Sequence, residues 1–218
     1  MNIKVCGITS KKQLQQLEGL NIAFAGFIFD EKSPRFAGEK MAEEDLIGMD
    51  LDTKKVGVFV DAEYEDIMEM VEKFELDMVQ LHGNESPELC EELSEDVEVI
   101  KAFSIGKETG SIDKLVAPYD DVVDYYLFDT SVKGKSGGTG EKFDWKKLND
   151  AKIEKPFFLS GGIGPEDAVA VKKFKHPDFF GIDVNSKFEK EPDYCSTNNL
   201  SWYLRVFSIR NLGRKYTN

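Results

Sequence analysis

Cysteine is scarce in this chain of 218 residues. Its three cysteines, Cys6, Cys90 and Cys195, lie far apart, and no two of them form a C-x-x-C pair or a spacing typical of a zinc site. The odd count also argues against a disulfide framework, which is built from pairs. We therefore expect a protein of the reducing cytoplasm that holds no metal.

The sequence also lacks long apolar runs and an excess of basic residues. No stretch approaches the length that spans a bilayer, and the N-terminus opens into a predicted strand rather than a signal peptide. The 28 lysines and arginines face 41 aspartates and glutamates, for a net charge of −13. Because such a surface repels nucleic acids and anionic membranes, we expect neither as a partner. An anionic ligand would be bound locally, by backbone N–H groups or a few placed cations.

There is no linker, no low-complexity segment, and no G-x-G-x-x-G turn after the first predicted strand. Short β-rich runs alternate with helical patterns, such as residues 63–74, 87–93 and 165–174. Two of these patterns begin with a proline, which is typical of the first position of a helix. The predicted strands are residues 3–7, 25–29, 55–60, 78–81, 99–103, 125–128, 156–160 and 181–184.

Eight strands that alternate with helices predict parallel pairing, because each crossover returns the chain in the same direction. The 218 residues leave about 27 per unit, which is compact for a (β/α)8 barrel. A doubly wound open sheet is the alternative, but it normally has fewer strands and often the missing glycine turn. We therefore predict an α/β protein, with residues 1–218 forming a single (β/α)8 TIM barrel domain with outer helices.

Two polar residues follow predicted strands at positions where barrels carry function. Cys6 ends the first strand, just before Gly7, and Asp129 follows the sixth strand. Each has a structural alternative: free cysteine is usually a small buried apolar residue, and an aspartate after a strand often caps the turn that follows.

Two further strand ends predict an anion site. After the seventh strand, residues 160–165 form a glycine-rich turn into a helix, where backbone N–H groups and the helix N-terminus can meet an anion. After the eighth strand, residues 183–186 are polar. The loops after strands 7 and 8 of a barrel frequently bind phosphate, so we expect a phosphorylated ligand.

A ligand held by its phosphate at these loops would lie between Cys6 and Asp129, which suits a base and an acid acting on one small sugar phosphate. An unperturbed thiol has a pKa of ~8.5, so a working base needs activation. We expect helix dipoles and backbone amides at the barrel mouth to supply it. A Cys–His hydrolase would have to use His82, which has no evident third partner.

Three other features lie after predicted strands. Arg35, after Ser33-Pro34, is placed to bind a carboxylate, with a solvated surface arginine as the alternative. His82 ends the fourth strand next to Gln80, and the two side chains could simply satisfy each other. The glycine-rich segment 134–140 could cover a ligand as a lid.

Together these segments resemble phosphoribosylanthranilate isomerase of tryptophan biosynthesis. The matching blocks run in order along the chain, and their joint occurrence is more specific than any one of them. They are residues 4–9, 26–29, 33–35, 56–60, 79–85, 128–130, 137–140, 143–145, 160–163 and 183–186. Residues 187–189, 194–197 and the tail 210–218 depart from the family pattern.

The resemblance implies a (β/α)8 barrel that catalyses an Amadori rearrangement without metal or organic cofactor. The substrate would be N-(5-phosphoribosyl)anthranilate and the product 1-(2-carboxyphenylamino)-1-deoxyribulose 5-phosphate. Asp129 would protonate the ring oxygen, and Cys6 would remove the C2 proton. Arg35 would meet the anthranilate carboxylate. The residues that we expect to contact substrate are Arg35, His82, Gly161, Gly162, Asp183, Asn185 and Ser186.

Two alternatives stay open at this point. One is another phosphate-binding barrel, such as a relative of indole-glycerol-phosphate synthase, for which Lys101 is the only suitable strand-end lysine. The other is a binding barrel that has lost catalysis, although Cys6 and Asp129 are both present. The protein could be a monomer or a homodimer.

Overall fold

The computed structural model describes residues 1–106, 108–132, 135–136, 143–191 and 194–195. Residues 134 and 137–140 of the predicted lid lie outside these ranges, as does the divergent tail 210–218. Within the described part, no helix is both long enough and apolar enough to cross a membrane.

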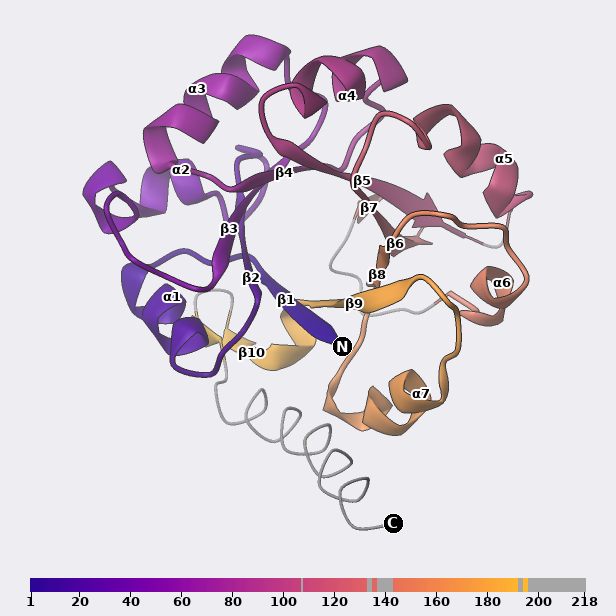
Figure 1. Ribbon diagram of the computed structural model, residues 1–218. Helices are drawn as coiled ribbons and strands as arrows, with labels where there is room; N and C mark the ends of the chain where they lie inside the picture. The colour runs from indigo at the N-terminus through magenta and orange to yellow at the C-terminus, as the bar shows by residue number, and fades with distance from the viewer. Residues whose placement is uncertain (107, 133–134, 137–142, 192–193, 196–218) are drawn as a thin grey trace, which may run out of the picture.

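Eight parallel strands close into a barrel, and Figure 1 shows the helices outside the ring of strands. The first strand pairs with both the second and the last, which closes the ring. The predicted (β/α)8 barrel is therefore confirmed, and the open sheet is wrong. In order round the barrel the strands are β1 (Asn2–Cys6), β2 (Phe24–Ile28), β3 (Lys54–Phe59), β4 (Met78–Leu81), β5 (Glu98–Ile105), β6 (Tyr125–Val132), β8 (Phe157–Leu159) and β9 (Phe179–Val184).

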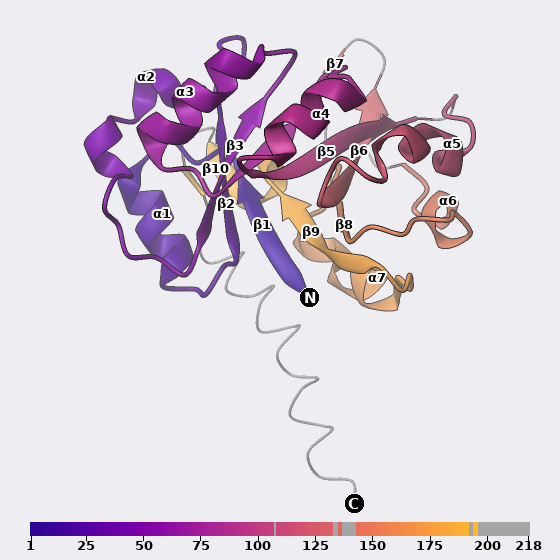
Figure 2. The same ribbon diagram turned by 45° about the horizontal axis from the view of Figure 1, so that its top comes forward.

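The helices between the strands are short, and Figure 2 shows them packed around the tilted strands. The α-helices are α1 (Lys11–Glu18), α2 (Ala37–Lys40), α3 (Tyr64–Phe74), α4 (Pro87–Ser94), α5 (Ile112–Val116), α6 (Lys146–Asn149) and α7 (Ala168–Lys173). Four 3₁₀ turns, η1 (Glu43–Asp45), η2 (Ala117–Tyr119), η3 (Pro165–Asp167) and η4 (Ser186–Phe188), supplement them. The predicted helix over residues 165–174 is thus a 3₁₀ turn followed by α7.

Short antiparallel pairs of strands add to the barrel. Strand β7 (Lys135–Ser136) pairs with the end of β6, and β10 (Glu189–Glu191) pairs with β11 (Tyr194–Cys195). Strand β6 thereby continues to Val132, well beyond the predicted end at residue 128. This extension matters for the site, because it places Asp129 inside a strand.

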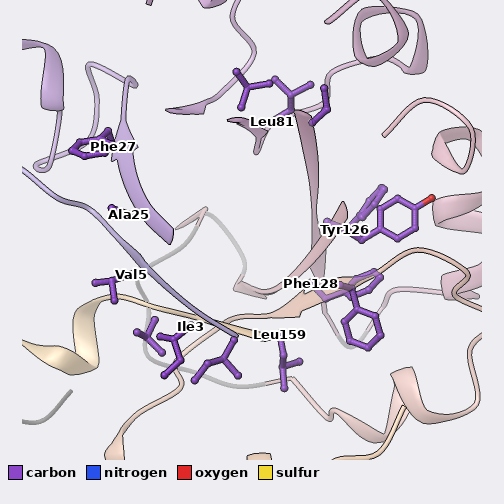
Figure 3. Close-up of a cluster of buried hydrophobic side chains, with 14 of the residues drawn as sticks. Ile3, Val5, Ala25, Phe27, Leu81, Tyr126, Phe128 and Leu159 are labelled. Carbon is purple, nitrogen blue, oxygen red and sulfur yellow. The ribbon is translucent and has the colours of Figure 1, made fainter. Parts of the chain in front are cut away.

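The strands bury two apolar layers, because successive side chains of a strand point to opposite faces. The outward layer lies between the strands and the helices, and Figure 3 shows part of it, with Ile3, Val5, Ala25, Phe27, Leu81, Tyr126, Phe128 and Leu159 labelled. The inward layer fills the barrel interior. Its buried members are Phe24, Val56, Met78, Ile100, Ala102, Leu127 and Phe158.

Toward the carboxyl ends of the strands the interior becomes polar. Lys4, Gln80, Asp129, Ser160 and Asp183 are all buried there, although such side chains are rarely buried unless they are paired. Apolar packing fills the interior toward the amino ends of the strands, so these polar groups lie at the end of the barrel that carries function in this fold.

Replacing Phe158 with alanine should strongly destabilise the barrel. Its ring is fully buried in the interior and makes edge contacts with Phe24 and Phe180, at centroid distances of 5.4 and 5.2 Å. We expect Phe158→Ala to lower the free energy of unfolding in urea by about 3–5 kcal/mol. Val169→Ala, at a side chain 60% exposed on α7, should change it by less than about 0.5 kcal/mol. Equal effects of the two changes would contradict this account of the core.

Candidate active site

Cys6 is the last residue of β1 and lies on its inward face with only 8% of its surface exposed. The chain then turns through Gly7, whose φ is +82°, and the N–H groups of Gly7 and Ile8 both donate to the carbonyl of Gly26 on β2. Cys6 is therefore buried, as the structural alternative expected. It nevertheless lies among polar groups at the barrel mouth rather than in either apolar layer.

A buried ion pair lies beside Cys6. Lys4 Nζ is 2.9 Å from Asp183 Oδ1, and both side chains are almost completely buried. Burial raises the pKa of the Cys6 thiol to about 11, although the Lys4 ammonium acts to lower it, while Asp183 raises it further. Burial also raises the pKa of Asp183, against the effect of Lys4. For Lys4 itself burial lowers the pKa, but the charges of Asp183 and Cys6 outweigh it and raise the pKa above its usual value.

Asp129 points into the same end of the barrel from β6. Its Oδ1 accepts a hydrogen bond of 2.7 Å from the N–H of Thr130, and its Oδ2 lies 3.4 Å from His82 Nε2. Asp129 lies within β6, and its carboxylate accepts from the N–H of the next residue of the strand rather than capping a turn that follows. One carboxylate oxygen is held by the backbone, and the other faces the site.

His82 is oriented by Gln80. The Gln80 amide nitrogen lies 3.0 Å from His82 Nδ1, so the amide can donate to this ring nitrogen and hold the orientation of the ring. The other ring nitrogen, Nε2, is buried without a hydrogen-bond partner and lies toward Asp129. The expected Gln80–His82 pair is thus present, but it satisfies one ring nitrogen and leaves the other directed into the site.

Arg35 crosses over the end of β1. A β-carbon on Gly7 would lie 2.5 Å from Arg35 Cδ and 3.3 Å from Asn185 Nδ2, so both side chains pack directly against this glycine. Arg35 is half-buried, with its backbone N–H donating to Ser33 Oγ at 3.2 Å. The alternative of a fully solvated surface arginine does not fit this position.

The two predicted phosphate loops lie side by side at the ends of β8 and β9, which pair with each other. Gly161 and Gly162 have positive φ values of 89° and 63°, and a side chain on Gly161 would overlap Thr130. On the other loop Asn185 Oδ1 is buried without a hydrogen-bond partner, and the backbone of Ser186 begins η4. An unpartnered buried oxygen and two left-handed glycines are consistent with a site shaped for a ligand.

Asp183 differs from the other members of the predicted set. Its carboxylate accepts from Lys4 and, at 3.2 Å, from Ser160 Oγ, both inside the barrel. Its carboxylate therefore lies between Lys4 of β1 and Ser160 at the end of β8.

A cavity of about 370 Å³ opens next to His82, between the ends of β3, β4 and β5. Lys101 lines it, but its ammonium is bound by Glu85 at 2.9 Å, by the Gly83 carbonyl at 2.9 Å and by two further carbonyls. Such a saturated ammonium is not free to act as an acid or a base. This argues against the alternative of a relative of indole-glycerol-phosphate synthase, for which Lys101 would have to be the reactive lysine.

Lys4 is the residue of this site that the sequence prediction missed. A signal was present, because Lys4 lies two residues before Cys6 in an otherwise apolar strand, and residues two apart share a face of a strand. Among the described residues, no group of three or more His, Cys, Asp or Glu side chains is arranged to hold a metal ion.

Comparison with known proteins decides the family. A family model described as N-(5'-phosphoribosyl)anthranilate (PRA) isomerase matches residues 3–193. The chain belongs to this family. Curated N-(5'-phosphoribosyl)anthranilate isomerases are similar to it: that of Parabacteroides distasonis is 44% identical over 207 residues, covering 94% of this chain and 92% of its own. That of Phocaeicola vulgatus is 37% identical over 196 residues, covering 88% and 90%.

Solved isomerases share the fold. Phosphoribosyl anthranilate isomerase from Thermus thermophilus is 27% identical, with a TM-score of 0.78 over 96% of this chain and 100% of its own. Another isomerase, solved with reduced 1-(o-carboxyphenylamino)-1-deoxyribulose 5-phosphate, is 26% identical, with a TM-score of 0.74 over 95% and 98%. Monomers made from the dimeric enzyme of Thermotoga maritima are 26% identical, with a TM-score of 0.72 over 95% and 98%. The predicted family and the predicted enzyme class, an isomerase of tryptophan biosynthesis, are confirmed.

Substituting Gly7 should impair the site through Arg35. Gly7→Ala places a β-carbon 2.5 Å from Arg35 Cδ, so we expect the arginine to shift and the KM of the isomerase to rise by roughly tenfold, the effect of losing about 1.4 kcal/mol of binding. Gly48→Ala is the matched control: its φ is also positive, +65°, but no atom lies within 4 Å of the added carbon. Both variants carry backbone strain of about 1–2 kcal/mol, and steady-state kinetics should separate them. Equal KM values would show that Gly7 serves only the backbone.

Proposed function

We propose that this isomerase converts N-(5-phosphoribosyl)anthranilate into 1-(2-carboxyphenylamino)-1-deoxyribulose 5-phosphate with Asp129 as general acid and Cys6 as general base. The observation that carries this assignment is the placement of the two groups. Both point into the mouth of the barrel, from β1 and β6, and the glycine turn after β8 and the polar loop after β9 lie between these strands. A sugar phosphate anchored at the loops can therefore meet an acid on one side and a base on the other.

The reaction begins with a proton from Asp129. Its Oδ2 gives the proton to the furanose ring oxygen, the C1–O bond breaks, and a Schiff base forms between C1 and the anthranilate nitrogen. Oδ1 keeps its hydrogen bond from Thr130, so the orientation of the carboxylate is preserved while its charge changes. His82 Nε2, 3.4 Å from Oδ2, is placed to stabilise the carboxylate that this step produces.

Cys6 then removes the C2 proton, and the resulting enolamine tautomerises to the ketone by moving a proton from the C2 hydroxyl to C1. The thiolate acts as a base and not as a nucleophile, because neither histidine lies beside it. His82 faces Asp129, and His176 is hydrogen-bonded to Ala151 O and to the N–H of Asp178. The arrangement of a Cys–His hydrolase is therefore not assembled in this chain.

The substrate carries an anion at each end, and the site offers a place for both. The phosphate would be bound by backbone amides at Gly161, Gly162 and Ser186, together with the side-chain NH₂ group of Asn185, which can donate to an anion. Arg35 would bind the anthranilate carboxylate, since a guanidinium can hold a carboxylate with two parallel hydrogen bonds. His82 contacts the substrate at the acid end. Asp183 would act on the base Cys6 by way of its contact with Lys4, and it would not bind the phosphate.

We place the enzyme in the cytoplasm as a monomer or a homodimer, without nucleic acid or membrane partners. Cys6 and Cys90 are free thiols, and the proposed chemistry needs Cys6 reduced, which a reducing compartment ensures. The net charge of −13 disfavours contact with polyanions. A related isomerase is dimeric, which supports testing the oligomeric state in solution.

Removing either proton-transfer group should abolish most of the activity. We expect Cys6→Ser and Asp129→Asn each to lower kcat by roughly 10²–10⁴-fold, the usual contribution of a positioned acid or base. The measurement is the loss of substrate fluorescence with each purified variant. Cys90→Ala is the matched control, because Cys90 is also a buried thiol, on α4, and its removal should leave kcat unchanged. Full activity of Cys6→Ser or Asp129→Asn would overturn the role of that residue.

Replacing Arg35 tests the carboxylate site separately. A hydrogen bond to a charged group contributes about 1.5–3 kcal/mol, so Arg35→Ala should raise KM by roughly 10–100-fold with a smaller change in kcat. Arg35→Lys should recover only part of this loss, because an ammonium cannot reproduce the paired geometry. An unchanged KM in steady-state assays would show that the substrate carboxylate lies elsewhere.

A further inference from the structure

The environment of Cys6 does not favour a thiolate. Burial raises its pKa to about 11, and the nearby Asp183 carboxylate raises it further. A general base must nevertheless be unprotonated when substrate arrives. The sequence pointed to helix dipoles and backbone amides as the source of activation. In the structure the Gly7 backbone does act to lower the pKa of Cys6, but the charge of Lys4, on the same strand as Cys6, has the larger lowering effect.

Lys4 lies two residues before Cys6 on the inward face of β1 and is fully buried. Lys4 Nζ and Cys6 Sγ each lie 3.0 Å from the point that a β-carbon of Gly26 would occupy. The ammonium and the thiol thus face each other across the space that this glycine leaves on β2. The charge of Lys4 acts to lower the pKa of the Cys6 thiol, which favours the thiolate.

The second partner of Lys4 is Asp183, which pairs in register with Lys4 across β1 and β9. One ammonium therefore lies close to two groups that can each carry a negative charge. Burial raises the pKa of Asp183 and of Cys6, so the state in which both are ionised is disfavoured. When Lys4 is charged, the trio is neutral overall if Asp183 and Cys6 share a single proton. That proton can reside on the carboxylate or on the sulfur.

Other titratable groups surround this trio. β2 contributes only Gly26 at this level, with no charge. Ser160, at the end of β8, donates to Asp183 Oδ2. Among the described residues, Asp129 from β6, His82 from the end of β4 and Arg35 above Gly7 are the other charged or titratable groups near the trio.

We propose that Lys4 is a positioning residue for the reaction: its buried ammonium holds Cys6 as the thiolate, while Asp183 takes up the proton that Cys6 releases. Lys4 gives one proton to Asp183 Oδ1 and accepts one from Cys6 Sγ, so it remains an ammonium throughout. The trio changes from ammonium, carboxylate and thiol to ammonium, carboxylic acid and thiolate, with no change in net charge. This inference rests on the proposed role of Cys6 as the base.

The test measures the reactivity of Cys6 without substrate, so that it does not depend on catalysis. Each variant is alkylated with iodoacetamide at a series of pH values, and the rate at Cys6 is followed by peptide mass spectrometry. Cys90, buried on α4, is the internal reference in the same digest and should react alike in every variant. Only the thiolate reacts, so the rate reports the ionised fraction.

Lys4→Met and Asp183→Asn should shift the reactivity in opposite directions. A nearby opposite charge shifts a pKa by roughly one to three units, so Lys4→Met should slow alkylation at neutral pH about tenfold or more. Asp183→Asn leaves Cys6 as the only anionic partner of Lys4 and should accelerate it. The acid limb of the kcat/KM profile should move with each, to higher pH in Lys4→Met and to lower pH in Asp183→Asn.

Lys4→Met leaves a buried carboxylate unpaired and can fail to fold, so the double variant Lys4→Met, Asp183→Asn provides the second comparison. It differs from Asp183→Asn only in lacking the ammonium, and its Cys6 should react at least tenfold more slowly. Equal rates in this pair, or shifts in the same direction for both single variants, would overturn the proposal. If instead Cys6→Ser kept full activity while these shifts occurred, the role of Cys6 would fail and the charge coupling would stand.

Discussion

The buried contact between Lys4 and Asp183 joins the first strand of the barrel to the last. The two residues are register partners across β1 and β9, the pair of strands that closes the ring. Breaking a buried ion pair from one side typically costs 3–5 kcal/mol, because the remaining charge is left without a partner. The closing seam of the barrel and the charge balance of the site therefore depend on the same contact.

This dependence explains how an acidic protein can hold an anionic base. The excess of negative charge lies mainly on the surface, where water and salt screen it. Inside the barrel the balance is local: one ammonium serves Asp183 and Cys6, and Ser160 holds the other carboxylate oxygen. Apolar packing of the lower interior around Phe158 shields these groups from water on one side, which strengthens each interaction.

Much of the fold was predictable from the sequence, because each strand is a short apolar run and each crossover restores its direction. The positions of Cys6 and Asp129 followed from the rule that function gathers at the carboxyl ends of barrel strands. The residues that contact Cys6 and Asp129 could not be predicted from this rule. Lys4 contacts Asp183 from the opposite end of the chain, and such a pairing depends on the closure and register of the barrel. The extension of β6 past Asp129 depends likewise on its neighbours β5 and β7.

The glycines of the site make room for side chains that come from other segments of the chain. At Gly7 the missing side chain makes room for Arg35 from another loop, and at Gly26 it makes room for Lys4 and Cys6 from the adjacent strand. At Gly161 it admits Thr130, the residue that fixes Asp129. In each case the glycine lies on one strand or loop and the side chain it accommodates comes from another. The geometry of this site is therefore set as much by side chains that are absent as by those that carry the chemistry.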